Sequence, residues 1–541
     1  MPSSSQKWTV LAISLSTFLL TVLVLERSII AHAGGHLAYP LDDTFIHMTI
    51  ARNLAFHGVW GISPTEFQSA SSSIFYTLTL ALLFKLFSVN ILIPFLLNLA
   101  AALFTLILIQ NWFDKKKISA RAQIATFMAL FFFTPLPIIV VSGMEHTLQC
   151  LFSILFLFTY GEWLERSLLQ PDTRKARLPW QLPLYGMLVT AIRYEGLFMV
   201  GMACLVLLYY RKIIPALLLG SLSLLPLLIF GAYSISKGSY FLPNSVLLKS
   251  DGAQLSVSGI LQYLTGNIFP KLSISTNGIA TAATQHLLVI LPLVYLLFRK
   301  PLKIATGYGS ILIILTGSIV LQLCLASTGW FYRYEASLVF CSVLIVSMII
   351  ASYGREILTP DRFGLSHIMA ACLLFILTLP LLLRSGIAFQ KAGQACGNIY
   401  SQQYQMARFV NRYYNNSVIA ANDIGAISFY KQQNNLDLFG LGNITVARRK
   451  MRKDCTPQFL DSLTRGEHTK IAVVYDSWFS DSLRSRWSKV ASWTIPNNVI
   501  CGDSIVSFYA IDPGSIDELK HALVDFAPTL PTGVAVHYFT N

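Results

Sequence analysis

Residues 71–87 read SSSIFYTLTLALLFKLF, and this stretch decides the fold that the sequence predicts. It is apolar enough to cross a membrane, as are eleven other runs of roughly 20 residues. If it crossed, every later loop would change sides and the cluster Lys115–Lys117 would lie outside, although cytoplasmic loops are the ones enriched in lysine and arginine. We therefore predict that residues 71–87 lie along the outer membrane surface, with Lys85 reaching toward water.

The eleven other runs are the predicted spans, and they place the N-terminus in the cytoplasm and the C-terminal part outside. With this topology, sixteen lysine and arginine residues of the membrane part lie inside and nine lie outside. The predicted spans are residues 8–28, 91–113, 121–141, 144–165, 181–193, 195–211, 213–236, 282–298, 304–326, 334–353 and 364–384. The first run also fits a cleaved signal peptide ending near Ala31-His32-Ala33, but its length and Glu26-Arg27 favour an uncleaved anchor.

Composition divides the chain at residue 385. Over all 541 residues, 54% are hydrophobic, 12% are charged and the mean hydropathy is +0.58. A soluble domain carries about 25% charged residues, so an ordinary soluble enzyme is excluded. We predict a membrane domain at residues 1–385 and a domain of soluble composition at residues 386–541. The net charge of +14 lies mostly in the membrane domain, where it sets orientation and gives no reason to expect a nucleic acid partner.

Residues 386–541 predict a small external α/β domain. Its β-rich runs are Val418–Asn422, Ala426–Tyr430, Leu436–Leu441, Ile471–Tyr475 and Ile505–Ile511. Gly440 and Gly442 in FGLGN are too few for a phosphate-binding loop and predict a plain turn.

Three cysteines, Cys396, Cys455 and Cys501, fall in this outer part, where disulfides persist. We predict one disulfide, with Cys455–Cys501 the favoured pair, and one free thiol. The chain has no CxxC or histidine-rich spacing, so we predict no metal site.

Charged residues near the spans are costly and invite a functional reading. Under this topology, charged or ionisable residues from six separate loops and helix ends meet at the outer membrane level. They are Asp42, Asp43, His47, Arg52, Glu66, Lys85, Glu145, Arg193, Glu195, Lys249, Arg333 and Glu335. This convergence predicts a site rather than a solvated surface.

The sharpest local feature is LDDTFIH at residues 41–47, which begins a helix that runs to about His57. Aspartates at a helix start cap free amides and favour the helix dipole whatever the function. Two carboxylates at a membrane rim also suit an enzyme that takes a proton from a hydroxyl group. The two roles are compatible, and adjacency alone does not choose between Asp42 and Asp43.

Each of the other candidates has a structural alternative. Glu145 could simply be a charged residue at the membrane interface. Arg193 and Glu195 could form an internal ion pair that interrupts a hydrophobic hairpin. Arg333 fits a residue that reaches from a span end to water. Lys249 fits either a point charge that binds phosphate or a solvated loop lysine.

The order of these motifs resembles the GT-C superfamily of integral membrane glycosyltransferases that use polyprenyl-phosphate sugars, and within it the bacterial arabinofuranosyltransferase-like branch. The resemblance covers most of the chain in order. Its segments are YPLDDTFIHMTIARNLAFHG (39–58), SASSSIFYTLTLALL (69–83), SGMEHTL (142–148), TAIRYEGL (190–197), FLPNSVLLK (241–249), FYRYEASL (331–338) and ANDIGAISFYKQQNNLDLFGL (421–441).

The resemblance implies a mainly α, polytopic membrane bundle with two interfacial helices in the first outer loop and an external α/β domain. It implies an inverting glycosyltransferase in which Asp42 is the catalytic base, with Asp43 as partner or rival. Tyr194 stands where the family usually has proline. The donor-binding residues that it implies are Arg193, Lys249, Arg333 and Tyr334, with His47, Arg52, Glu145, Glu195 and Asn244 as further site candidates.

The implied partners are the lipid bilayer, a polyprenyl-phosphate sugar and an envelope glycan or glycolipid acceptor. The implied location is the bacterial inner membrane, with the N-terminus cytoplasmic and the C-terminal domain periplasmic. The sugar, a pentose such as arabinofuranose or a hexose, does not transfer from the family, and a divalent metal is not required but stays open. Two alternatives also stay open: a flippase of lipid-linked sugars, which predicts paired repeats and mid-membrane charges, and a non-catalytic glycan-binding protein.

Overall fold

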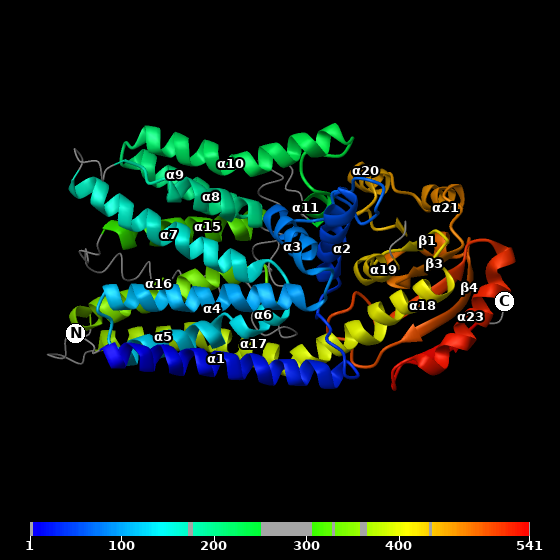
Figure 1. The fold of residues 1–541 in the computed structure, drawn as a ribbon, viewed down its shortest axis with the longest axis horizontal. Coiled ribbons are helices and arrows are strands. Elements are labelled where there is room, and N and C mark those ends of the chain that lie inside the picture. The colour runs from blue at the N-terminus through cyan, green and yellow to red at the C-terminus, as the bar shows by residue number, and fades with distance from the viewer. Residues whose placement is uncertain are drawn as a thin grey trace.

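The computed structural model describes residues 4–170, 177–249, 306–326, 331–357, 365–431 and 435–539. Two parts follow one another along the long axis of the molecule (Figure 1). One is a bundle of long helices that holds the N-terminus at its far end, and the other is a smaller α/β part that ends the chain. Helices α2 (Asp42–His57) and α3 (Ile74–Phe87) lie where the two parts meet.

The bundle consists of apolar helices that run roughly along the same axis (Figure 1). They are α1 (Ser4–His32), α4 (Leu92–Lys115), α5 (Ala120–Phe133), α6 (Leu136–Val141), α7 (His146–Leu169), α8 (Gln181–Ile192), α9 (Gly196–Tyr209), α10 (Ile213–Ser236), α15 (Thr306–Leu325), α16 (Ala336–Ile357) and α17 (Leu365–Ile399). Within the described ranges, five helices are long and apolar enough to cross a membrane, namely α1, α4, α7, α10 and α15. Leu217, Leu228 and Ile229 of α10 are exposed, as expected of a lipid-facing surface. The chain is a multi-pass membrane protein.

The helix expected at residues 71–87 is present as α3, which packs against α2 at the end of the bundle, and its place on the membrane surface stays a prediction. Ser73 caps α3, because its side chain accepts a hydrogen bond from the Tyr76 amide. The span predicted at 121–141 is divided at Thr134 and Pro135 into α5 and α6. The span predicted at 282–298 lies outside the described residues.

Helix α17 continues without interruption from the bundle into the α/β part. It passes residue 385, ends at Ile399 and leads through a π-helix, Tyr400–Tyr404, into α18 (Gln405–Tyr413). The division into domains at residue 385 therefore stays a prediction.

The α/β part contains a mixed sheet of six strands among the residues described. Its strands are β1 (Ile419–Ala421), β2 (Asn435–Asp437), β3 (Ile471–Val474), β4 (Ser488–Thr494), β5 (Ile505–Ala510) and β6 (Ala535–Tyr538), in the order β2-β1-β3-β5-β4-β6. The pairs of β1 with β2 and with β3 are parallel, and the remaining pairs are antiparallel. Its other helices are α19 (Gly425–Lys431), α20 (Ile444–Met451), α21 (Pro457–Gly466), α22 (Asp481–Arg484) and α23 (Ile516–Phe526).

Two predictions for this part are wrong. Ala426–Tyr430 is not a strand but most of helix α19, whose ends are hydrogen-bonded by side chains from α2. The disulfide Cys455–Cys501 is absent, and both residues are free thiols. Cys501 is buried with its sulfur 3.3 Å from Gln403 Oε1, whereas Cys455 packs in a separate apolar cluster.

Candidate active site

A cavity of about 340 Å³ opens where the bundle, α2 and the α/β part meet. Its apolar lining includes Ile46, Met144 and Phe198, and Leu441 of the α/β part closes one side. Its charged and aromatic polar lining comes from Asp43, His47, Arg193, Tyr194, Glu195, Arg333 and Tyr334. Six of the residues that the sequence singled out therefore meet in one space.

Helix α2 supplies the acidic edge of this cavity. Gly58 ends the helix in the left-handed conformation at φ 69°, and its amide is directed at the carbonyls of Asn53 and Leu54. At 100° per residue, Asp43, Ile46 and His47 share one face, and this face lines the cavity.

Asp43 and Arg333 form an ion pair across the cavity, with Nη2 of Arg333 2.5 Å from Oδ2 of Asp43. The Arg333 side chain is 2% exposed and that of Asp43 is 23% exposed. Nε and Nη1 of Arg333 have no hydrogen-bond partner among the residues described. A buried guanidinium with unsatisfied donors is costly unless a ligand or water accepts them.

The backbone before Arg333 is in an uncommon conformation. Phe331 and Tyr332 have φ values of 55° and 63°, in the left-handed region that bulky residues avoid. Such residues cost about 1–3 kcal/mol each and cluster at functional sites.

Arg193, in contrast, is fully occupied by two glutamates. Its Nε and Nη2 donate to Glu195 at 3.1 and 2.5 Å, and its Nη1 donates to Glu145 at 2.7 Å. The break between α8 and α9 makes this possible, because Arg193 is extended at the end of α8 and Glu195 precedes α9. The Tyr334 ring lies near both guanidinium groups, with its centroid 5.3 Å from Arg193 and 4.9 Å from Arg333.

His47 joins the cavity to α3 and to Glu145. Its Nδ1 lies 3.1 Å from the Ser71 hydroxyl and 3.2 Å from that of Thr77, and its Nε2 lies 3.6 Å from Glu145. Burial lowers the pKa of His47, although the Glu145 carboxylate opposes the shift. The imidazole is therefore neutral near pH 7.

Asp42 and Arg52 do not line this cavity. Asp42 accepts hydrogen bonds from the amides of Gly425 and Ala426, at 2.5 and 2.7 Å, and so caps the start of α19. Arg52 donates to the carbonyls of Phe429 and Ser428, at 2.5 and 3.3 Å, near the end of the same helix. Helix α2 thus places the carboxylate of Asp42 at the positive end of the α19 dipole and the guanidinium of Arg52 at its negative end.

A carboxyl group that sequence analysis missed lies beside Asp42. Burial and the nearby Asp423 raise the pKa of Asp42 well above its usual value, and the two amide hydrogen bonds oppose this. Asp423 also accepts hydrogen bonds from Gln403 and Tyr475, at 2.9 and 3.0 Å. The only sequence signal for this role was its place in NDIG, two residues before the start of α19.

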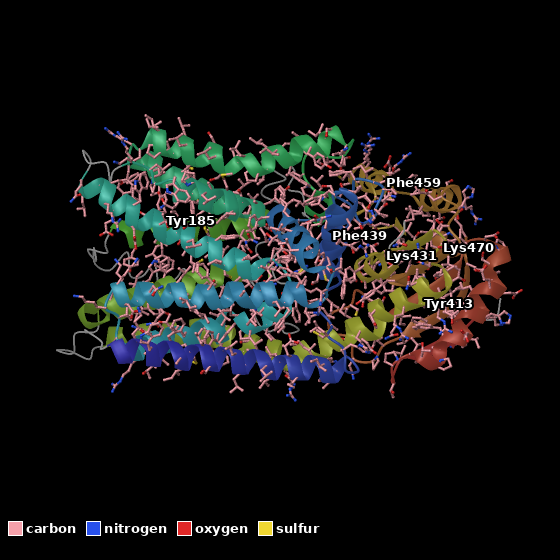
Figure 2. All side chains as sticks on the ribbon, viewed as in Figure 1. Tyr185, Tyr413, Lys431, Phe439, Phe459 and Lys470 are labelled. Atoms are coloured by element: carbon pink, nitrogen blue, oxygen red, sulfur yellow. The ribbon has the colours of Figure 1, made fainter. Side chains whose placement is uncertain are left out.

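The FGLGN turn, predicted as a plain turn, is built around a second missed carboxylate. Asp437 accepts amide hydrogen bonds from Phe439, Gly440 and Gly442, at 2.7, 3.0 and 2.7 Å. Phe439 lies near the junction with the bundle (Figure 2). The turn holds Leu441 at the cavity wall.

Asn244 and Lys249 are the two ends of the short helix α11 (Asn244–Lys249). Asn244 is buried and donates to the Leu441 carbonyl at 3.2 Å, so it joins the bundle to the FGLGN turn. The side chain of Lys249 lies outside the described residues. The described residues hold no group of three histidine, cysteine, aspartate or glutamate side chains placed to bind a metal ion.

Fold and cavity together define a polytopic membrane protein whose polar site lies at one end of the bundle, beneath an α/β part. The structure of ArnT from Cupriavidus metallidurans bound to undecaprenyl phosphate is similar, with a TM-score of 0.52 and 12% identity over 93% of this chain and 98% of that chain. The apo state of the same protein gives a TM-score of 0.49 at 13% identity, over 95% and 99% of the two chains. The Archaeoglobus fulgidus oligosaccharyltransferase in complex with Zn and sulfate gives 0.47 at 10% identity, over 96% of this chain and 74% of that chain.

In sequence, residues 397–509 match a domain of unknown function, DUF8728. No curated protein matches the chain. The likeness to ArnT, which extends over nearly the whole of both chains, confirms the GT-C fold that the resemblance implied.

Proposed function

We propose that the protein is an inverting glycosyltransferase that moves a sugar from a polyprenyl-phosphate donor to a hydroxyl group of an envelope glycan or glycolipid. The observation that carries this proposal is the pair of Asp43 and Arg333 in the cavity. A carboxylate that accepts a proton and a cation with free donors are the two groups that such a transfer requires. The solved structure of ArnT with undecaprenyl phosphate adds support from the fold.

Between the two aspartates, the geometry favours Asp43 as the base. Its carboxylate is partly exposed to the cavity, while that of Asp42 is bonded to the amides of α19. A base must reach the proton that it takes, and Asp42 has no such access. Asp42 is therefore proposed as a residue that holds α19.

Arg333 is the proposed partner of the donor phosphate. Its free Nε and Nη1 would donate to phosphate oxygens, and charge-assisted bonds of this kind are stronger than neutral ones. A phosphate at Arg333 would also compete with Asp43 for Nη2 and so free the carboxylate to accept a proton. Arg193, already held by Glu145 and Glu195, would position the Tyr334 ring and add a second, weaker positive field.

The chemical step follows from these positions. The acceptor hydroxyl gives its proton to Asp43 while its oxygen forms a bond to the anomeric carbon from the side opposite the phosphate. The bond between that carbon and the phosphate oxygen breaks, and its electron pair leaves with polyprenyl phosphate. Arg333 stabilises the charge that develops on this leaving group, and the anomeric configuration inverts.

The proposed orientation places the cavity at the outer face of the cytoplasmic membrane of a bacterium. Lys7 and Asp114 form a 2.9 Å ion pair at the opposite end of the bundle, next to the Lys115–Lys117 cluster. That end is the cytoplasmic one by its positive charge. The N-terminus is then cytoplasmic and the α/β part periplasmic.

The test uses the full chain in liposomes with a panel of polyprenyl-phosphate pentoses and hexoses and envelope-glycan acceptors. Release of polyprenyl phosphate and formation of the glycoside are followed for wild type, Asp43→Asn and Glu66→Gln. Glu66 is an exposed acid of the same outer loop and serves as the matched control. Transfer that only Asp43→Asn abolishes is the expected result.

Two outcomes would overturn the proposal. Transfer unchanged in Asp43→Asn would remove the mechanism. Movement of lipid-linked sugar between leaflets, with no glycoside formed from any donor, would make the protein a flippase.

A further inference from the structure

A second cavity lies on the other side of α2. It has a volume of about 160 Å³ and is lined by Phe45 of α2, by the loop at His36 and by three tyrosines, Tyr400, Tyr404 and Tyr430. A neighbouring space of about 560 Å³ shares Ile91 and Tyr430 with it and extends along Arg52 and Phe56. Residues 45, 52 and 56 lie roughly opposite residues 43 and 47 on the helix, so α2 separates this region from the Asp43 cavity.

The wall of the second cavity is a cluster of aromatic rings. Centroids of His36 and Tyr400 are 5.4 Å apart with planes 21° from parallel, and those of Tyr400 and Tyr404 are 5.3 Å apart at 20°. Tyr430 stands edge-on to Tyr404 at 5.1 Å. Gly34 fixes the cluster, because a Cβ at this position, where φ is 59°, would come within 3.1 Å of the Tyr400 hydroxyl.

The backbone of this wall is also unusual. Tyr400 and Tyr404 are the first and last residues of the π-helix that joins α17 to α18. Helices of this type are rare and frequently occur at functional sites.

The three tyrosine hydroxyls make no hydrogen bond to another described residue, so the wall combines apolar ring surface with free polar groups. An acyl chain in this space would leave the hydroxyls unpaired, which is costly when they are buried. A sugar has CH groups that pack on aromatic rings and hydroxyls that bond to the tyrosines. Among the described residues that line the two spaces, none is acidic, so nothing there would attract an amino sugar.

We propose that the aromatic cavity between α2 and the π-helix binds a neutral or acidic saccharide unit. This inference rests on the proposed function, in which the saccharide unit is part of the acceptor. Helix α2 is about 10–12 Å across with its side chains, so a unit bound here is not the one that reacts at Asp43. The acceptor is then an oligosaccharide whose chain passes around α2.

The binding test needs no donor and no transfer. The full chain, in lipid nanodiscs free of glycoside detergents, is titrated with methyl α-arabinofuranoside, methyl β-galactopyranoside and galactosamine, and bound sugar is detected by saturation-transfer NMR. We expect both methyl glycosides to bind and galactosamine to bind more weakly. Tyr400→Ala should abolish binding, and Tyr404→Phe, which keeps the ring and loses one hydroxyl, should weaken it about fivefold.

Tyr413→Ala is the matched control, because Tyr413 lies at the far end of α18, away from the cavity (Figure 2). Equal binding in Tyr400→Ala and wild type would overturn the proposal, as would the absence of glycoside binding. Contacts from lipid chains to Tyr404 in place of sugar would assign the cavity to lipid and overturn it as well. Sugar binding without transfer by any variant would remove the proposed enzyme and leave the saccharide site standing.

Discussion

On one face of α2 the carboxylate of Asp43 lines a cavity and forms an ion pair with Arg333, two of whose nitrogens have no hydrogen-bond partner among the described residues. On the other side, one residue earlier, Asp42 is buried against α19 and holds two of its amides. Arg52, further along the latter side, holds the carbonyls at the opposite end of α19. The Asp43 face leaves hydrogen-bonding capacity for a ligand, whereas Asp42 and Arg52 use theirs to hold α19.

The difference teaches that neighbouring residues of one type can have unrelated tasks. Successive helical residues are 100° apart, so a pair such as Asp42 and Asp43 is directed at two environments. The α/β part occupies one of these environments, and an open cavity occupies the other.

The largest difference between the two sides of α2 should appear when each aspartate is neutralised separately. We expect Asp43→Asn to lower the transfer rate by about 10²–10⁴, the usual contribution of a general base, and Asp42→Asn to lower it by less than about tenfold. The rate with a saturating donor is the measurement, with circular dichroism as the check of folding. A greater loss in Asp42→Asn than in Asp43→Asn would reverse the assignment.

The next largest difference is expected between variants of Arg333 and Arg52 in their affinity for lipid phosphate. Arg333→Gln removes a charged donor from the cavity, so we expect the Kd for undecaprenyl phosphate to rise about 10–100-fold. Arg52→Gln, on the far side of the helix, should leave this Kd unchanged. Binding of the lipid phosphate in nanodiscs measures both, and equal weakening by both variants would contradict the separation of the two faces.

The stability of the fold should depend on Asp42, the aspartate that we expect to matter less for the transfer rate. Asp42→Ala leaves two amides of α19 without their acceptor, and we expect the free energy of unfolding to fall by about 1–3 kcal/mol. Lys85→Gln, at an exposed position of the same outer loop, should change it by less than about 0.5 kcal/mol. Denaturant titration followed by tryptophan fluorescence measures the difference, and a loss as large in Lys85→Gln would show that the cap is unimportant.

The smallest expected effect is a dependence of stability on pH that arises from the ionisation of Asp42. Burial and Asp423 raise the pKa of Asp42, so its contribution to stability is complete below its ordinary pKa and is lost as the pH rises through the raised value. The Tm of wild type should therefore fall relative to that of Asp42→Asn as the pH rises from about 4, the ordinary pKa of an aspartate, through the raised pKa of Asp42. A Tm difference independent of pH would show that Asp42 titrates alike in the folded and unfolded chain.

Much of the fold could be predicted because membrane helices obey local rules. Hydropathy and loop charge predicted a helix at residues 71–87 outside the spans, and α3 forms there and lies at the end of the bundle against α2. Predictions failed where a distant contact outweighs a local preference. Ala426–Tyr430 reads as a strand but forms most of α19, because Asp42 and Arg52 bind the ends of that helix.

For the cavity, the sequence predicted which charged residues lie near one another but not the partners that they bind. The convergence of outer charges predicted that Asp43, Arg193 and Arg333 meet, and all three line the cavity. Asp423 and Asp437 were missed because acceptors of backbone amides carry no periodic signal. The disulfide failed for a similar reason, since sequence shows which cysteines share a compartment but not which approach one another.

The sequence alone was enough to predict the apolar helices of the bundle, the short helices at its end and the charged residues that gather there, because the bilayer imposes length and charge rules that act on short segments. Only the tertiary structure decided which aspartate faces the cavity, which arginine keeps free donors and where aromatic rings enclose a second space. Those outcomes depend on residues up to about 380 positions apart, such as Asp42 and Gly425. Their contacts are set by packing of whole elements, and no local pattern encodes them.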